Sequence, residues 1–218
     1  MVVLRMAHRG TFITFEGLDG CGKSTQMRRL AVRLRKMGRT VLETAEPGGT
    51  PIGLKVRRIL LDSANRELSP AAELLLYFAC RAQNVDEWIV PALERGDIVL
   101  SDRFTDSSLV YQGIGRGLGV EPVMALDRIA CRGLVPGLTL LIDIDLETGL
   151  QRAHARNRRE NEIESRMDEQ AVEFHRIVSG AYQDLAAREP ERIKVIDGGR
   201  TMAAVERDIW EIVARYVS

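Results

Sequence analysis

The segment GLDGCGKST, residues 17–25, limits the possible folds of this chain more than any other part of it. Its pattern, G-x-x-x-x-G-K-[ST], is that of a phosphate-binding loop, which lies between a buried strand and a helix. Residues 11–17 (TFITFEG) are rich in β-forming side chains, and residues 24–37 carry apolar side chains at helical spacing. This context favours a phosphate-binding loop over the alternative, a glycine turn that only caps a helix.

The residues of this loop suit it to an anionic ligand. Glycines let successive backbone N–H groups point inward and surround a phosphate at the N-terminus of the following helix. We expect Lys23 to bridge the β- and γ-phosphates of a nucleotide, and the Ser24 hydroxyl to ligate Mg²⁺. Position 21 requires only a small side chain, so we assign its cysteine no redox role. The expected nucleotide-binding residues are Gly17, Leu18, Asp19, Gly20, Cys21, Gly22, Lys23, Ser24 and Thr25.

Short apolar runs alternate with longer amphipathic segments along the rest of the chain, which is typical of βαβ units. Besides the strand before the loop, we expect strands at residues 39–44, 96–103, 137–145 and 192–197. After the helix that follows the loop, we expect further helices at residues 52–61, 69–93 and 202–216. The predicted fold class is α/β, a three-layer α/β/α P-loop NTPase fold with a five-stranded parallel sheet. It forms one domain over residues 1–218.

The charge balance argues against a nucleic-acid partner, because 31 basic residues are matched by 31 acidic ones and no long-range positive field remains. Only four of the basic residues are lysines. Arginine-rich codon usage explains most of this imbalance, and the alternative is that some guanidinium groups face phosphate. Three widely spaced cysteines and three scattered histidines do not support a disulfide framework or a histidine-centred metal site.

No run of residues approaches the roughly 18 apolar residues that a membrane span needs. We therefore expect a cytoplasmic protein with no membrane partner. The unpaired spacing of the cysteines fits such a reducing compartment.

Two further segments carry charged side chains in informative places. SDRF, residues 101–104, follows an expected strand, and ligands of parallel sheets lie at the carboxyl ends of strands. We expect Asp102 to approach Mg²⁺ through water and Arg103 to bind phosphate. Residues 152–167 (RAHARNRRENEIESRM) are almost entirely charged or polar, so their composition predicts a solvated loop or mobile flap, a short lid.

Together with three more segments, these motifs resemble the thymidylate kinase family, whose members phosphorylate thymidine monophosphate (dTMP) with ATP. The resemblance covers FEGLDGCGKST at residues 15–25, EPGGTPIG at 46–53, LLLYFACRAQ at 74–83, SDRFTDSSLVYQG at 101–113 and the arginine-rich lid around 156–166. The segments occur in the family's order over most of the chain. A phosphate-binding loop alone would fit many functions, whereas the five segments together are specific.

The resemblance implies roles for residues that would bind the base and sugar of dTMP. Tyr77 would stack on thymine, where the family usually has phenylalanine, and Arg81 would donate to a ring carbonyl from the same helix face. The neighbouring Phe78 is expected in the core. The family pattern puts Ser108 and Gln112 at the edge of the base, and the alternative for both is ordinary helix surface. Tyr111 would lie against the sugar and exclude a ribose 2′-hydroxyl.

The resemblance also implies the residues that hold the acceptor's hydroxyl and phosphate. Asp19 would bind the 3′-hydroxyl, and Arg103 the monophosphate. Arg57 resembles a second arginine that reaches this phosphate, with the adjacent Arg58 as the alternative. The remaining expected substrate-binding residues, from the second matching segment, are Glu46 and Pro47.

Members of the family differ in whether a catalytic arginine stands in the phosphate-binding loop or in the lid. Here Gly20 occupies the loop position, so the chain resembles the bacterial, lid-arginine type. The lid carries Arg156, Arg158, Arg159 and Arg166. At least one of the first three is expected to be catalytic, and the alternative is a solvated charge run balanced by nearby glutamates.

The implied reaction moves the γ-phosphoryl group of ATP to the 5′-phosphate of dTMP and yields dTDP and ADP. Lys23, Mg²⁺ and a lid arginine would neutralise the transferred group. Two alternatives stay open: a kinase for deoxyuridylate or a deoxynucleoside, and a nucleotide-dependent switch. A GTPase switch should carry N-K-x-D, and no asparagine here precedes a lysine. Relatives are homodimers, so we expect a homodimer.

Overall fold

The structure is a computed structural model, which describes residues 9–160 and 165–217 apart from the side chains of residues 158–160. Its centre is a five-stranded sheet with the order β2-β3-β1-β4-β5, in which every pair of neighbouring strands is parallel. The five expected strands are confirmed. They are β1 (Thr11–Glu16), β2 (Val41–Ala45), β3 (Ile98–Asp102), β4 (Leu138–Asp143) and β5 (Ile193–Asp197).

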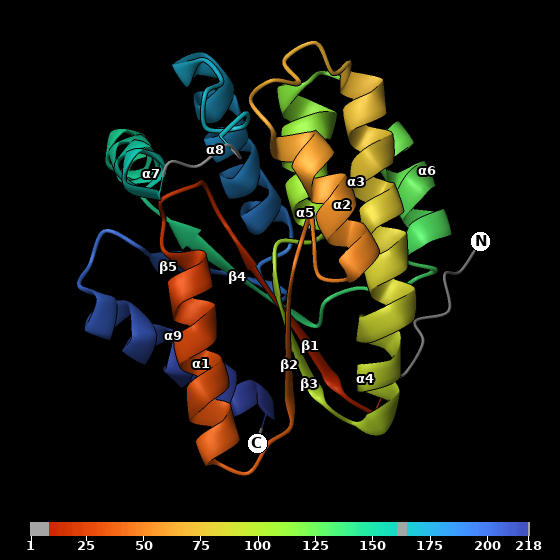
Figure 1. Ribbon diagram of the computed structural model, residues 1–218. Coiled ribbons are helices and arrows are strands. Elements are labelled where there is room, and N and C mark those ends of the chain that lie inside the picture. Colours follow the sequence, from red (N-terminus) through yellow and green to blue (C-terminus); the bar gives the residue numbers. More distant parts are fainter. Residues whose placement is uncertain (1–8, 161–164, 218) are drawn as a thin grey trace.

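Helices cover both faces of this sheet, as Figure 1 shows. The elements before β4 are α1 (Lys23–Lys36), α2 (Pro51–Leu61), α3 (Pro70–Asn84), the π-helical η1 (Val85–Ile89), α4 (Val90–Arg95), α5 (Thr105–Ser108), the π-helical η2 (Leu109–Gly115) and α6 (Val120–Ala130). Those after β4 are α7 (Leu146–Glu160), α8 (Val172–Arg188) and α9 (Met202–Val217). The single helix expected over residues 69–93 is divided among α3, η1 and α4, which follow one another without a break.

Alternation of side chains along β1 explains the three layers. Ile13 and Phe15 point to the face covered by α1 and α9, whereas Phe12 points to the face covered by α3, α4 and α6. All three side chains are buried. A third apolar cluster joins residues of α2, η2 and α8 to residues of β4 and β5, and it includes Leu60 and Tyr182.

The strand register brings the two main sequence motifs together. Phe15 in β1 pairs with Asp102 in β3, so the phosphate-binding loop and the SDRF segment leave the sheet side by side. Since β1 lies between β3 and β4, its carboxyl end is at the centre of the sheet. This is the edge at which ligands of parallel sheets bind.

The prediction of a loop over residues 152–167 is wrong for its first half, because α7 continues to Glu160. Asp145 accepts hydrogen bonds from the backbone and the hydroxyl of Thr148 and thereby caps the start of α7. Ala153 is fully buried between exposed charged neighbours. Arginine, alanine and glutamate are good helix formers, so a highly charged composition does not by itself predict a loop.

Within the described residues, no helix has the length and apolar character needed to cross a membrane.

Candidate active site

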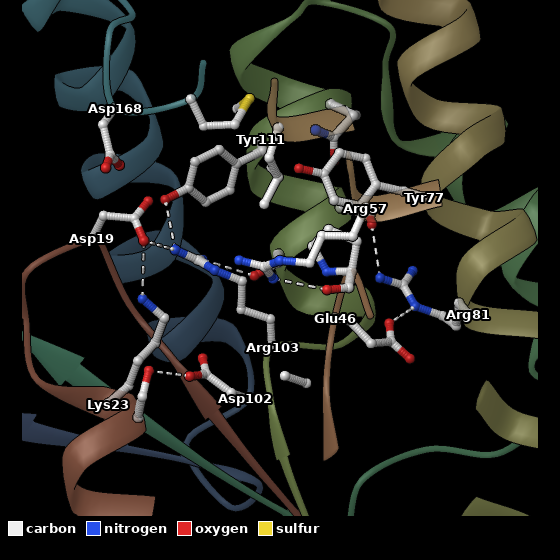
Figure 2. A pocket seen from close by; sticks show the side chains of 18 of the residues that line it. Asp19, Lys23, Glu46, Arg57, Tyr77, Arg81, Asp102, Arg103, Tyr111 and Asp168 are labelled. Atoms are coloured by element: carbon white, nitrogen blue, oxygen red, sulfur yellow. Dashed lines mark hydrogen bonds and ion pairs between the residues drawn. The ribbon is translucent and has the colours of Figure 1, made fainter. Parts of the chain in front are cut away.

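A cleft of about 260 Å³ opens at the carboxyl edge of the sheet (Figure 2). It brings together most of the residues that the sequence analysis singled out. They are Asp19, Lys23, Ser24, Glu46, Pro47, Arg57, Tyr77, Arg81, Asp102, Arg103, Ser108, Tyr111, Gln112 and Arg156. Arg58 is not among the residues that line it, so Arg57 is the better of the two adjacent candidates.

The phosphate-binding loop needs its glycines for conformation and for space. Gly20 has a φ of +78°, and a Cβ there would lie 2.1 Å from the carbonyl oxygen of Gly149 in α7. Gly22 has a φ of 96° and caps α1. An arginine at position 20 would therefore be strained and would clash with the lid helix, so any catalytic arginine has to come from elsewhere. Within the same loop, Leu18 and Cys21 point into the core.

Lys23 is held at the bottom of the cleft. Its Nζ donates to the Leu18 carbonyl at 3.2 Å and to Asp19 Oδ1 at 3.4 Å. Only 6% of the residue is exposed. Burial acts to raise the pKa of Asp19, but the charges of Arg103 and Lys23 outweigh it and hold that pKa well below its ordinary value.

Ser24 and Asp102 form the part of the site that fits a divalent cation. The Ser24 hydroxyl donates to Asp102 Oδ2, so a loop hydroxyl and a strand-end carboxylate lie in contact. Such hard oxygen donors are the ligands that Mg²⁺ prefers, and it usually takes only one or two from the protein. In the described part of the chain, no three His, Cys, Asp or Glu side chains cluster as a metal site. The donor set therefore fits Mg²⁺ shared with a nucleotide.

Arg103 is fixed from two sides. Its Nη2 donates to Asp19 Oδ1 at 3.0 Å and Tyr111 Oη at 3.3 Å, and its Nη1 donates to Ser107 Oγ at 3.1 Å and Tyr182 Oη at 3.3 Å. Figure 2 shows that Arg103 and Lys23 both point toward Asp19. Two cations on one carboxylate leave positive charge to spare for an anion.

Glu16 supports Arg103 through Ser107 and Tyr182, which contact both residues. The sequence analysis missed this role. Its Oε1 accepts from the Phe104 backbone at 2.8 Å, and its Oε2 accepts from Ser107 Oγ at 2.5 Å and Tyr182 Oη at 2.8 Å. Burial, followed by repulsion from Asp106, raises the pKa of Glu16 to about 7. An acid as the last residue of a buried strand was the available signal.

At the opposite end of the cleft, Arg81 is almost completely buried. Its Nε donates to Glu46 Oε2 at 2.5 Å, and its Nη2 donates to the Phe104 carbonyl and to Ser108 Oγ, each at 3.0 Å. Its Nη1 is buried and has no hydrogen-bond partner among the described residues. Arg81 Nη1 is therefore available to donate to a ligand beside Tyr77. Phe78, the neighbour of Tyr77, lies in the core as expected.

Ser108, Tyr111 and Gln112 are buried and line the cleft, so the alternative of ordinary helix surface is wrong for Ser108 and Gln112. Arg57 donates from Nη1 to the Pro47 carbonyl at 2.8 Å, and the Glu46–Pro47 peptide is cis.

The lid contributes Arg156, which reaches the cleft from α7. Its Nη2 donates to Asp168 Oδ2 at 3.1 Å. Burial and the nearby Asp19 raise the pKa of Asp168 to about 6. Sequence analysis missed Ala45, Leu61, Ser107, Met167 and Asp168 as cleft residues. The side chains of Arg158 and Arg159 lie outside the described residues.

Arg166 differs from the expectation that it belongs with the solvated lid arginines. Only 3% of it is exposed. It donates to the Leu60 carbonyl at 2.5 Å and pairs with Glu73 at 2.8 Å. A buried carboxylate and a carbonyl thus hold this guanidinium inside the protein.

Comparison with known proteins identifies the family of this chain. A family model described as thymidylate kinase matches residues 15–209. The thymidylate kinase of Pelobacter propionicus is 50% identical over 190 residues, covering 87% of this chain and 87% of that protein. That of Deinococcus radiodurans is 47% identical over 206 residues, covering 94% and 97%.

A crystal structure of thymidylate kinase from Ehrlichia chaffeensis matches the fold with a TM-score of 0.74 at 30% identity, covering 94% of this chain and 98% of that one. The main interpretation therefore holds over a deoxynucleoside kinase or a nucleotide switch. The chain belongs to the thymidylate kinase family and transfers a phosphoryl group from ATP to dTMP.

Proposed function

We propose that ATP and dTMP bind in the cleft with their phosphates meeting near Asp19. One observation carries this proposal: Lys23 and Arg103 both contact the Asp19 carboxylate, and Arg156 lies near enough to lower its pKa. Three cations face Asp19 and Asp168, the carboxylate that Arg156 pairs with, and leave net positive charge for two phosphorylated substrates. Bringing two anions together is the main electrostatic task of this reaction.

At the donor end, the backbone of residues 17–25 and Lys23 bind the β- and γ-phosphates of ATP. Ser24 and Asp102, which are in contact with each other, would hold Mg²⁺, Ser24 as a ligand and Asp102 through water. When bound, the cation neutralises charge on the phosphates.

At the acceptor end, Tyr77 stacks on thymine and Arg81 gives its free Nη1 donor to a ring carbonyl. Glu46 holds Arg81 in that orientation. Ser108 and Gln112 face the edge of the base, and the ring of Tyr111 excludes a 2′-hydroxyl. The sugar and phosphate are bound by Asp19, Pro47, Arg57 and Arg103.

The nucleophile needs no strong base, because the second pKa of a phosphate monoester is about 6 and the acceptor is mostly dianionic at pH 7. The protein's part is to align that dianion and to balance charge. Arg103 and Arg57 fix the acceptor phosphate, and Lys23 and Arg156 contact the transferred group.

Three substitutions test these roles. Lys23→Met, Arg103→Ala and Arg156→Ala should each leave a folded protein whose kcat/KM for dTMP falls by about 10³ or more, the scale expected when a phosphate-contacting cation is lost. Steady-state kinetics with ATP and Mg²⁺ measures the effect, and circular dichroism checks folding.

Arg152→Ala is the matched control for Arg156→Ala, because Arg152 is exposed on the same helix. It should keep nearly full activity. Near-normal turnover of Arg103→Ala or Lys23→Met would contradict the proposed roles, and equal effects of Arg152→Ala and Arg156→Ala would remove the case for Arg156.

We also propose a cytoplasmic homodimer. Ile52, Leu75 and Ile129 are exposed apolar side chains on α2, α3 and α6, and α3 packs against both of the other helices. Figure 1 places these three helices on one side of the molecule. The three cysteines are unpaired and buried, in keeping with a reducing compartment.

A further inference from the structure

Glu73, in the first turn of α3, is a fully buried carboxylate with an unusual number of partners. Its Oε1 accepts from Gln112 Nε2 at 2.8 Å and from Arg116 Nε at 3.2 Å. Its Oε2 accepts from Arg116 Nη2 at 3.1 Å and pairs with Arg166 Nη1 at 2.8 Å. The sequence analysis assigned this residue no role.

These partners keep Glu73 ionised inside the protein. Burial acts to raise the pKa of Glu73, but the hydrogen bonds from Arg116 and Gln112, together with the two arginine charges, lower it below its ordinary value. An ionised carboxylate can only accept hydrogen bonds.

The ionised state of Glu73 decides how the Gln112 amide is turned. If the amide were reversed, its carbonyl oxygen would face a carboxylate oxygen with no proton between them, so only Nε2 can point to Glu73. Gln112 lines the cleft, and no described residue donates to its Oε1. Because one N–H of Nε2 is held by Glu73, the amide's only acceptor, Oε1, is turned away from Glu73 and stays available to whatever lies beside it in the cleft.

From this arrangement we propose that Glu73 is a specificity-determining residue, which fixes Gln112 with its oxygen toward the base and so makes the cleft reject 4-aminopyrimidines. The inference rests on the proposed function in one respect, that Gln112 faces the base edge. Arg81 Nη1 then supplies a donor and Gln112 Oε1 an acceptor. A 4-carbonyl and an N3–H complement this pair, whereas cytosine offers the opposite pattern at both positions.

Glu73→Gln tests the proposal directly. Two guanidinium N–H groups face the Oε2 position, whereas the Oε1 position faces one, Arg116 Nε, and Gln112, so the new carbonyl oxygen would stay at Oε2 and the new NH₂ group would face Gln112. Gln112 would then reverse its amide and turn an N–H group to the base. The ratio of kcat/KM for dTMP to that for dCMP should fall by about tenfold or more, as expected when one buried hydrogen bond is mispaired.

The control measurements distinguish a changed orientation of the Gln112 amide from a general loosening of the pocket. The ratio of dTMP to dUMP should stay within about twofold of wild type, because both bases have the same edge. Arg116→Met removes a partner of Glu73 but leaves the carboxylate paired with Arg166, so its ratio of dTMP to dCMP should not change. A merely structural role for Glu73 would lower kcat/KM for all acceptors alike and leave both ratios unchanged.

A double variant covers the case in which Glu73→Gln does not fold. Glu73→Gln/Gln112→Glu keeps one carboxylate in the cluster and again turns an oxygen to the base, so it should restore the ratio of dTMP to dCMP. Failure to restore it, or an unchanged ratio in folded Glu73→Gln, overturns the proposal. Gln112→Met shows which idea has failed: if it does not change the ratio, then Gln112 is not at the base edge and the proposed function is at fault.

Discussion

Arg103 occupies a backbone conformation that few residues other than glycine adopt, with a φ of 73°. Such a conformation costs about 1–2 kcal/mol for an L-residue. The Phe15 carbonyl accepts from the Arg103 N–H at 2.9 Å, and Glu16 accepts from the next N–H along the chain. Two residues at the end of β1 therefore hold the turn that directs the Arg103 guanidinium into the cleft.

The raised pKa of Glu16, which holds this turn, predicts that the free energy of unfolding depends on pH. This pKa rises from an ordinary 4.5 to about 7, so the folded state keeps a proton that the unfolded state loses. The corresponding stability is fully present below pH 4.5 and is lost as pH rises toward 7. Glu16→Gln stays neutral, so its free energy of unfolding relative to wild type should rise by about 3 kcal/mol between pH 4.5 and 7.5.

Urea unfolding at a series of pH values measures this difference. Above pH 7.5 the two curves should run parallel, because the carboxyl is then ionised in both states of the wild type. A difference that does not vary between pH 4.5 and 7.5 would show that Glu16 titrates normally.

At the scale of elements, the lid helix α7 is joined to the protein body on both sides. Its first turn packs against the phosphate-binding loop at Gly20, and the segment that follows it is anchored by Arg166 to Glu73 and the Leu60 carbonyl. Arg156 lies between these two attachments. Its reach into the cleft therefore depends on both of them.

Two arginine pairs next to that anchored segment allow a matched comparison. Arg166→Met breaks a buried pair with Glu73 and should lower the free energy of unfolding by about 3–5 kcal/mol. Arg66→Met breaks an exposed pair with Glu169 and should change it by less than about 1 kcal/mol. Chemical denaturation measures both.

Hydrogen exchange adds a local readout to this comparison. Arg166→Met should speed exchange of the backbone amides in residues 165–170, whereas Arg66→Met should not. Equal losses of stability in the two variants would mean that Arg166 does not anchor the lid.

The strands and the lid helix also differ in how well they could be predicted from the sequence. The five strands are short segments rich in apolar and β-branched residues, so their positions were predictable to within a few residues. The helical part of the lid was not, because Ala153 is the one buried residue among those described there and gives little periodic signal between polar and charged neighbours. Glu73 and Asp168 could not be distinguished from surface acids, because partners such as Arg116 and Asn157 meet them only in the folded chain.

For the whole molecule, the proposed homodimer gives the clearest prediction. Ile129, 74% exposed on α6, and Leu75, 56% exposed on α3, should be covered in the dimer. Leu75→Glu/Ile129→Glu should therefore be monomeric by light scattering, while the wild type is dimeric. Val32→Glu, on α1 at the opposite face of the sheet, introduces the same charge at an exposed apolar site and should remain dimeric. A monomeric wild type would refute this interface.

The burial of all three cysteines has a practical consequence for labelling the lid helix α7. Burial raises the pKa of Cys80 to about 11 and also raises the pKa values of Cys21 and Cys131, so few native thiolates exist at neutral pH. A cysteine introduced at the exposed Gln151 of α7 would react with a fluorescent maleimide far faster than the native thiols. Lid movement could then be recorded in an enzyme whose own cysteines are all retained.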